Sequence, residues 1–193
     1  NMHSIRQYLL NNFEFVTADR EGGLYPIEAT FPPCEMGKLL AKNSYISRYY
    51  ADVLTTDQVV AHASNALVGT HFNISTPYTR RVNAGNLADN SNALINRLLA
   101  ESNAATPSGN ARHSATGTLV HKLFGRYPYG VAYSHGKFVE YKLFNSTRNP
   151  EHFAWYARVM KALIKGADER RFTEADTASR MAALRRLAAK SPS

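Results

Sequence analysis

The sequence predicts an α+β fold in which helices pack on one face of a largely antiparallel sheet. Segments with strand-like alternation are interleaved with amphipathic helical segments. They do not follow the regular strand–helix–strand rhythm of a parallel sheet, and no internal repeat of about 20 to 50 residues is present. The 193 residues are enough for one domain with a buried core.

A hairpin is predicted near the N-terminus. Residues 13–16 are strand-like, a glycine-containing turn follows, and residues 24–31 form the second strand. Pro32 and Pro33 end this strand, because proline cannot donate a hydrogen bond to a sheet ladder.

The middle of the chain alternates helices with one strand. Residues 34–50 and 55–67 carry apolar side chains at helical spacing. Residues 69–75 alternate polar and apolar side chains, which is typical of a strand with one face in the core. Residues 87–101 form another amphipathic helix, and residues 102–117, rich in Ser, Asn, Ala and Gly, are predicted to be a loop.

The C-terminal part combines one strand with two helices. After a turn at Ser134-His135-Gly136, residues 137–144 alternate as a strand. Asn149 is a helix N-cap and Pro150 occupies the first helical position, which predicts a helix to about residue 165. A last helix, rich in Ala and Arg, ends at about residue 189.

Charge and composition narrow the class of protein. The chain has 23 Lys and Arg against 15 Asp and Glu, a formal charge of +8. Such an excess attracts phosphate groups, and part of it lies in residues 168–193, which we interpret as the basic C-terminal helix of a single domain over residues 1–193. With 44% hydrophobic and 20% charged residues, the composition excludes a chain that is disordered throughout.

The sequence also excludes several common sites. No apolar run approaches the roughly 20 residues that cross a bilayer, so we expect a cytoplasmic protein without a membrane partner. Cys34 is the single cysteine and by itself forms neither an internal disulfide nor a cysteine zinc site; we interpret it as an incidental thiol. There is no Walker phosphate loop, dinucleotide glycine turn or Gly-x-Ser-x-Gly elbow.

Strand 69–75 carries the first candidate binding residues. Because side chains alternate along a strand, His71, Asn73 and Ser75 share one face and Phe72 lies on the other. An imidazole, a carboxamide and a hydroxyl together suit a ligand or a metal. The alternative is an ordinary solvated face of the sheet.

Strand 137–144 carries two charged candidates, Glu140 and Lys142, on the same face as Phe138 and Phe144. Charges among apolar neighbours need partners. A glutamate on a concave sheet face suits Mg²⁺, and a lysine two residues later suits phosphate. The alternative is an edge strand with a cross-strand ion pair.

Further candidates lie outside these two strands. Asp19 and Glu28 in the hairpin offer the hard oxygen ligands that Mg²⁺ prefers, although Asp19 equally suits a turn. Arg80, Arg81 and Arg126 carry the planar fork that suits phosphate, with surface solvation as the alternative for each.

Taken in order, these segments resemble the carboxylate–amine ligases of the glutamine synthetase and glutamate–cysteine ligase superfamily, in particular the amidoligase-like enzymes of phages and bacteria. The matching segments are Asp19 to Gly22 with Glu28 and Pro32-Pro33, Gly69-Thr70-His71-Phe72-Asn73-Ile74-Ser75, Val139-Glu140-Tyr141-Lys142-Leu143-Phe144-Asn145-Ser146-Thr147, and Asn149-Pro150-Glu151. The family carries a Glu-x-Arg strand followed by a polar turn and a helix, and Lys142 stands here in place of the arginine.

The resemblance implies a curved antiparallel sheet, similar to that of glutamine synthetase, whose concave face binds ATP and Mg²⁺. It implies that the carboxylate of an amino acid or peptide is phosphorylated and that an amine then attacks the acyl phosphate to form an amide. The residues that we assign are Arg126, Glu140 and Lys142 for catalysis; His71, Asn73, Arg80 and Arg81 for the nucleotide; and Asp19, Glu28, His71 and Glu140 for the metal.

Two other functions stay open. A basic nucleic-acid-binding or assembly module is supported by the charge of +8 and by a C-terminal helix with Arg180, Arg185 and Arg186. A catalytically inactive relative of the ligases is the other alternative. Members of the family begin with a Glu-x-Glu strand, whereas the corresponding segment here carries Glu14 between two phenylalanines.

Overall fold

The computed structural model describes residues 11, 15–18, 27–53, 69–75, 83–105, 132–145, 149–168 and 174–189. The chain divides into two compact units. The first comprises residues 1–68 and 146–154, and the second comprises residues 69–145 and 155–193. Helix α7 (Pro150–Ala167) begins in the first unit and ends in the second.

The first unit contains the predicted hairpin. Strands β1 (Phe15–Ala18) and β2 (Ile27–Thr30) are antiparallel, with Thr17 opposite Glu28. The prediction of a hairpin here is confirmed, and β1 overlaps the last two residues of the predicted first strand.

The predicted helix over residues 34–50 is wrong as a single element. In its place are α2 (Met36–Leu39), α3 (Tyr45–Arg48) and the π-helix η1 (Tyr49–Val53). The chain leaves the helical conformation before Ser44, whose backbone is extended at φ −75° and ψ 164°. Its Oγ accepts a hydrogen bond from the backbone N–H of Ser47 at 3.2 Å, so Ser44 caps a new helix.

Aromatic rings connect the helical part of the first unit. Phe31 packs edge-on against Tyr49, with ring centroids 5.6 Å apart, and Tyr50 lies 6.0 Å from both Tyr49 and Phe153. Burial raises the pKa of the Tyr49 phenol, which keeps it neutral. These rings tie the start of α7 to η1.

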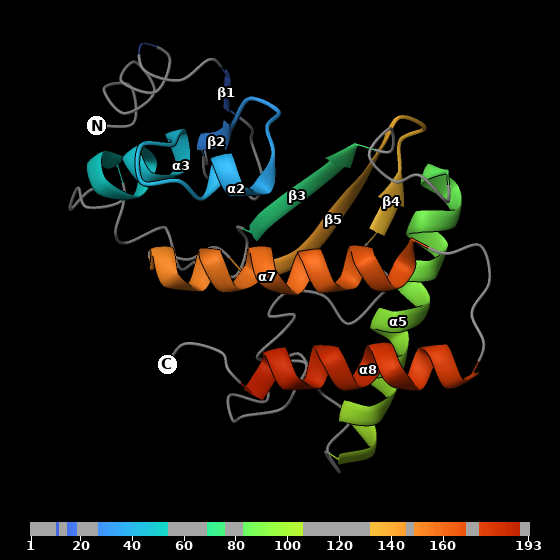
Figure 1. The fold of residues 1–193 in the computed structure, drawn as a ribbon. Coiled ribbons are helices and arrows are strands. Elements are labelled where there is room, and N and C mark those ends of the chain that lie inside the picture. Colours follow the sequence, from blue (N-terminus) through green and yellow to red (C-terminus); the bar gives the residue numbers. More distant parts are fainter. Residues whose placement is uncertain are drawn as a thin grey trace. The chain divides into compact units, whose positions relative to one another are not determined.

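The second unit is built on a three-stranded antiparallel sheet in the order β3-β5-β4 (Figure 1). The strands are β3 (Gly69–Ser75), β5 (Phe138–Asn145) and β4 (Ala132–Ser134). The first two confirm the predicted strands 69–75 and 137–144. The sequence pattern of residues 132–134 predicts neither a helix nor a strand. Their pairing with β5 shows that they form a strand.

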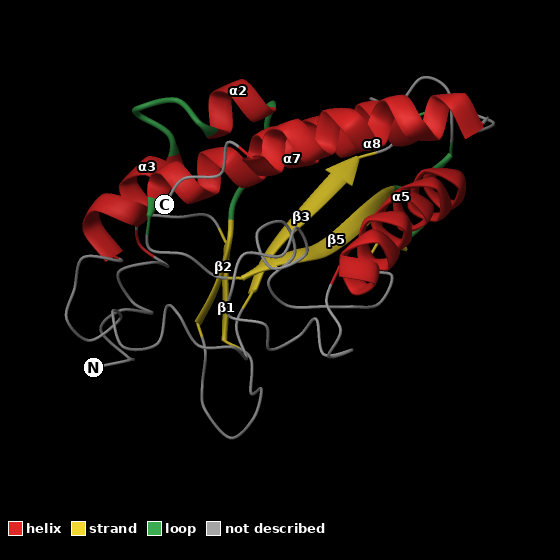
Figure 2. Ribbon diagram, turned by 90° about the horizontal axis from the view of Figure 1, so that it is seen from below, coloured by secondary structure: helices red, strands yellow, loops and turns green. Residues whose placement is uncertain are grey.

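Long helices lie beside this sheet, and the sequence predicts them (Figure 2). They are α5 (Ala84–Ala105), α7 and α8 (Glu174–Ala189). Helix α5 is longer than predicted, because Asn83 caps it by accepting the N–H of Asn86 at 2.8 Å. Helix α5 also continues through residues 102–105, so the loop predicted there is wrong. Two alanines, which are strong helix formers, end this stretch and favour the helix. The predicted helix 55–67 lies outside the described residues.

The core of the second unit lies between the sheet and the helices. Its largest fully buried side chains are Leu87, Leu94, Ile95, Leu143, Tyr141, Phe144, Met160, Leu163 and Met181. Helix α7 is joined to α8 by the Trp155 indole, whose Nε1 donates to the carbonyl of Leu187 at 2.9 Å. The described fold is therefore α+β with helices on an antiparallel sheet.

Asn92 of α5 completes the hydrogen bonds of strand β4. Its Nδ2 donates to the carbonyl of Ala132 at 2.9 Å, and its Oδ1 accepts the N–H of the same residue at 3.0 Å. The side-chain amide thus does for Ala132 what a neighbouring strand would do. This pairing fixes the position of α5 along the sheet.

A bulge in β5 changes the face on which one predicted residue lies. Thr70 pairs with Phe144 but Phe72 pairs with Tyr141, so β5 contains one residue more than β3 between the two pairs. The alternation of side chains reverses beyond this point. Phe144 is 1% exposed and stacks on Tyr156 of α7 with ring centroids 4.2 Å apart. The prediction that Phe144 lies on the polar face is therefore wrong.

A buried polar chain links the sheet to α5. Ser91 Oγ lies 2.6 Å from the carbonyl oxygen of Leu87, which can only accept, so the Ser91 hydroxyl donates there. The Tyr141 hydroxyl, 2.8 Å from the same Oγ, must then donate to Ser91. Burial raises the pKa of Tyr141 to about 12, so this donor stays protonated at neutral pH.

We expect Ser91→Ala to destabilise the fold more than Tyr141→Phe does. The first change leaves the buried Tyr141 hydroxyl without an acceptor, at a cost of about 1–3 kcal/mol, whereas the second removes the hydroxyl itself and costs about 0.5–1.5 kcal/mol. The double variant should be close to Tyr141→Phe. Urea unfolding followed by fluorescence of Trp155, the single tryptophan, measures all three; a milder effect of Ser91→Ala would contradict this hydrogen-bond direction.

Candidate functional site

One face of the β3-β5-β4 sheet carries polar side chains. Glu140 lies on the central strand, with Asn73 of β3 opposite it on one side and Tyr133 of β4 on the other. Asn73 and Tyr133 are exposed, as is His71 of β3. The opposite face holds Phe72 and Tyr141 in the core, as the alternation predicted.

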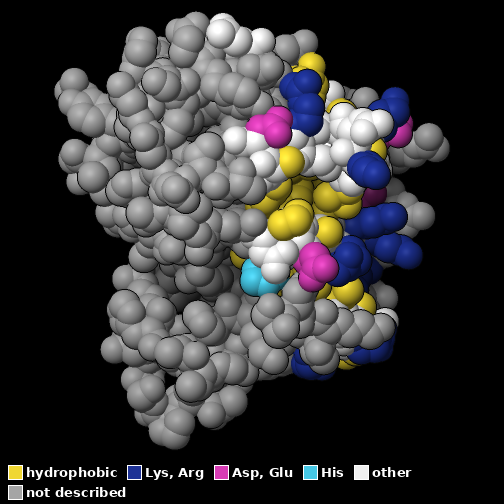
Figure 3. Space-filling view, turned by 90° about the vertical axis from the view of Figure 1, so that its left-hand side faces the viewer, with side chains coloured by type: hydrophobic (Ala, Val, Ile, Leu, Met, Phe, Trp, Pro, Cys, Tyr) yellow, Lys and Arg dark blue, Asp and Glu magenta, His cyan; other side chains and the backbone are white. Residues whose placement is uncertain are grey.

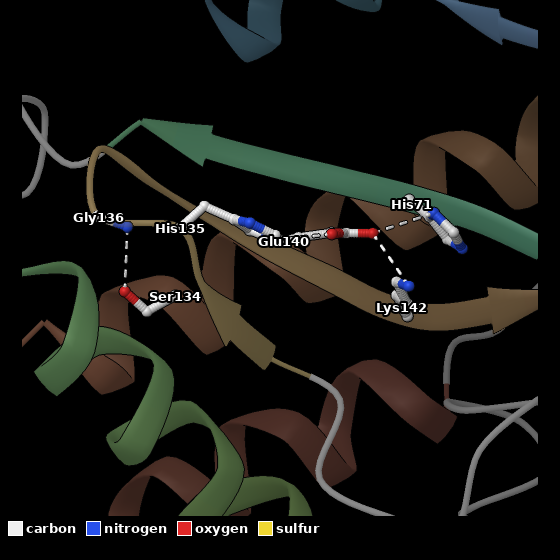
Figure 4. A network of polar contacts seen from close by, with 6 residues as sticks. All are labelled: His71, Ser134, His135, Gly136, Glu140 and Lys142. Carbon is white, nitrogen blue, oxygen red and sulfur yellow. Dashed lines mark hydrogen bonds and ion pairs between the residues drawn. The ribbon is translucent and has the colours of Figure 1, made fainter. Parts of the chain in front are cut away.

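Glu140 is the centre of a network of ionic contacts (Figure 4). Its Oε2 lies 2.8 Å from Nε2 of His135. Its Oε1 lies 3.5 Å from Nδ1 of His71 and 3.4 Å from Nζ of Lys142. The carboxylate side chain is 20% exposed and therefore keeps some contact with water. One anionic group is thus surrounded by three nitrogen-bearing side chains from β3, β5 and the turn before β5.

The turn between β4 and β5 positions His135. Gly136 has a φ of +83°, a conformation that glycine adopts without a steric penalty. The backbone N–H of His135 donates to the carbonyl of Phe138 at 2.9 Å, and its imidazole stacks on the Phe138 ring with centroids 4.7 Å apart. The ring is held between a hydrogen bond to Glu140 and an aromatic contact.

Lys142 contacts two groups at once. Its ammonium lies 3.4 Å from the Glu140 carboxylate and 5.6 Å from the centroid of the Tyr133 ring. Both interactions favour a cation at this position. The side chain is 36% exposed, so a ligand on this face has access to the charge.

The surroundings of Glu140 act on its pKa in opposite directions. Partial burial raises it, while the hydrogen bond with His135 and the charges of Lys142 and His71 lower it. The net result is a pKa below the ordinary value of 4.5. Glu140 is therefore ionised at neutral pH, the form in which a carboxylate binds a cation.

This lowered pKa predicts how stability depends on pH. Glu140 binds its proton more weakly in the folded state than in the unfolded state. Its contribution to the unfolding free energy is therefore fully present above pH 4.5 and is lost as the pH falls through the lowered pKa. The difference in unfolding free energy between wild type and Glu140→Gln should shrink in that window. Urea titrations at several pH values measure this difference, with Asp89→Asn at an exposed position of α5 as the control. An unchanged difference down to pH 2 would contradict the prediction.

The structure brings together four of the residues predicted from the sequence. His71, Asn73, Glu140 and Lys142 lie on the same face of one sheet. Glu28 lies in β2 and belongs to the other compact unit. Four further predicted residues, Asp19, Arg80, Arg81 and Arg126, lie outside the described residues.

Sequence reasoning missed two residues of this face, His135 and Tyr133. His135 was assigned to a turn, and Tyr133 lay in a segment without a recognised pattern. A hairpin assignment with Tyr133 opposite Glu140 would have found both, because a turn then places the histidine beside the strand pair.

The basic charge of the chain is distributed over surface and packing positions. Figure 3 shows Lys and Arg side chains gathered along one side of the described surface, with acidic side chains among them. In α8, Arg185 and Arg186 are exposed. Arg180 is half-buried, and the stem of its side chain lies against Gly166 of α7. A Cβ at position 166 would come within 3.1 Å of the Arg180 Cδ.

No family model, curated protein or solved structure matches this chain. Among the helices that the structure describes, none combines the length and apolarity that crossing a membrane requires. Within the same described residues, no three His, Cys, Asp or Glu side chains are grouped so that they could hold a metal ion by themselves.

Proposed function

We propose that this chain is an ATP- and Mg²⁺-dependent carboxylate–amine ligase, and that the polar face around Glu140 is its nucleotide and phosphate site. The observation that supports the proposal is the meeting of Glu140, His71 and Lys142 on one face. The sequence predicts a catalytic, nucleotide or metal role for each of them, and the Glu140 carboxylate contacts the other two within 3.5 Å.

The donor set at this face fits a magnesium–nucleotide complex better than a free metal ion. Mg²⁺ is usually held by one or two carboxylates together with substrate phosphates and water. Glu140, ionised at neutral pH, supplies one such carboxylate. Bound Mg²⁺ would supply neutralisation of the phosphate charge.

The other residues of the face would bind and orient the substrates. Lys142 would turn from the Glu140 carboxylate to a phosphate oxygen, for which an ammonium is a suitable partner. His71 and Asn73 would line the nucleotide, with Arg80 and Arg81 as further phosphate ligands. Arg126 would hold the transferred phosphoryl group. Phosphoryl transfer depends chiefly on such positioning and charge neutralisation.

A larger curved sheet similar to that of glutamine synthetase would contain β3, β5 and β4, and the protein would act in the cytoplasm. Its substrates would be an amino-acid or peptide carboxylate and an amine.

The experiment is to incubate the protein with ATP, Mg²⁺, and a panel of amino acids and peptides paired with amines. We expect ADP and phosphate to be released only when a carboxylate and an amine are both present, with an amide product in the mass spectrum. Omission of each substrate in turn is the control. Absence of turnover together with absence of ATP binding would overturn the proposal.

A further inference from the structure

An exposed aromatic ring lies beside the charged groups of this face. Tyr133 is 48% exposed, although it belongs to a paired strand of the sheet. It stands opposite Glu140 in the register of β4 and β5, and the ammonium of Lys142 lies 5.6 Å from its ring centroid. The face therefore offers an accessible π surface immediately next to a cation.

A nucleotide matches this pair of features. A base can stack on a tyrosine ring, and the phosphates that follow it need a cation nearby. The Lys142 ammonium contacts both the Tyr133 ring and the Glu140 carboxylate, so it adjoins an aromatic end and a charged end of the site. His71 and His135, also on Glu140, add hydrogen-bonding groups at the charged end.

We propose that Tyr133 is the stacking residue for the base of the bound nucleotide, with Lys142 at the adjoining phosphate. This inference rests on the proposed function and adds a rule of specificity to it. Stacking uses the π face that every base has, so its contribution does not depend on which purine is bound. Removal of the ring should therefore lower the affinity for ATP and the affinity for GTP by the same factor.

Calorimetric titration tests this assignment. The proteins are wild type, Tyr133→Ala and Tyr133→Phe, and the ligands are ATP, GTP and inorganic tripolyphosphate, each with Mg²⁺. We expect Tyr133→Ala to weaken ATP and GTP binding by about 5- to 150-fold, the range that loss of one stacked base produces. Tripolyphosphate, which has no base, should bind as tightly as before. Tyr133→Phe keeps the ring and should stay within about twofold of wild type.

The first unit offers a matched control. Tyr45 of α3 is 37% exposed, and the Arg48 guanidinium lies 5.1 Å from its ring centroid, so it is a comparable tyrosine–cation pair. Tyr45→Ala should leave the binding of all three ligands unchanged. Equal unfolding temperatures of the variants would show that the fold is intact.

Four results would overturn the inference, and they are distinguishable. Equal weakening of ATP and tripolyphosphate, or no weakening of either, would remove Tyr133 from base binding and leave the proposed function standing. Failure of the wild-type protein to bind both ATP and tripolyphosphate would overturn the proposed function itself. Tighter, Tyr133-dependent binding of a single-stranded RNA oligonucleotide than of ATP would assign the stacking to a nucleic-acid strand instead.

Discussion

Replacement of Glu140 by glutamine is expected to lower ATP-dependent amide formation by at least about 100-fold, comparable to the loss of one preorganised electrostatic group from an active site. Glutamine keeps the shape of the side chain but cannot carry the negative charge that a cation requires. It also leaves Lys142 and the histidines without their anionic partner. Product formation measured by mass spectrometry under saturating ATP reports this effect.

The unfolding free energy of this variant should fall by no more than about 1 kcal/mol, because the ion pairs that it removes are partly exposed. Asp89→Asn makes the same chemical change at an exposed position of α5 and should retain full activity. If Glu140→Gln and Asp89→Asn were equally active, the assignment of the site to Glu140 would be wrong. Urea unfolding of both variants separates lost activity from lost structure.

The largest effect on stability is expected from Phe144→Ala, at about 3–5 kcal/mol, the usual cost of removing a fully buried phenyl ring. Phe144 stacks on Tyr156 of α7 and packs edge-on against Phe72, with centroids 5.8 Å apart. The substitution therefore opens a cavity between the sheet and a helix. The shift of the urea midpoint, converted with a common m-value, measures the change.

Phe138→Ala is the matched control. Strict alternation along β5 assigns Phe138 and Phe144 to the same polar face, so the sequence alone predicts similar, modest losses. In the structure Phe138 is half-buried and stacks on His135, and its removal should cost no more than about 1.5 kcal/mol. Equal losses for the two variants would contradict the bulge that places Phe144 in the core.

Local periodicity predicted the part of the site that lies on regular strands. His71 and Asn73 alternate with Phe72, and Glu140 alternates with Tyr141, so their faces follow from side-chain geometry within each strand. His135 could not be predicted in this way, because a turn residue has no fixed face. Its position depends on the hydrogen bond of its N–H to Phe138 and on the left-handed Gly136.

The helices show the same division. Asn149 and Pro150 correctly predicted the start of α7, and Asn149 Oδ1 accepts the N–H of Glu151 at 2.9 Å. Apolar spacing over residues 34–50 predicted one helix, but the cap formed by Ser44 divides it. A hydrophobic pattern records which side chains are buried and does not record where the backbone is interrupted.

The sequence pattern predicts the α+β class, the two long strands of the second unit and, as far as the bulge in β5, which of their faces is polar. These features depend on neighbours within a few residues, and alternation or helical spacing expresses them directly. The pairing of β3 with β5, the bulge that buries Phe144, and the contacts of Glu140 with His71, His135 and Lys142 are found only in the folded structure. Pairing and register arise from contacts between segments distant in the chain, where one extra residue reverses the face of every side chain beyond it.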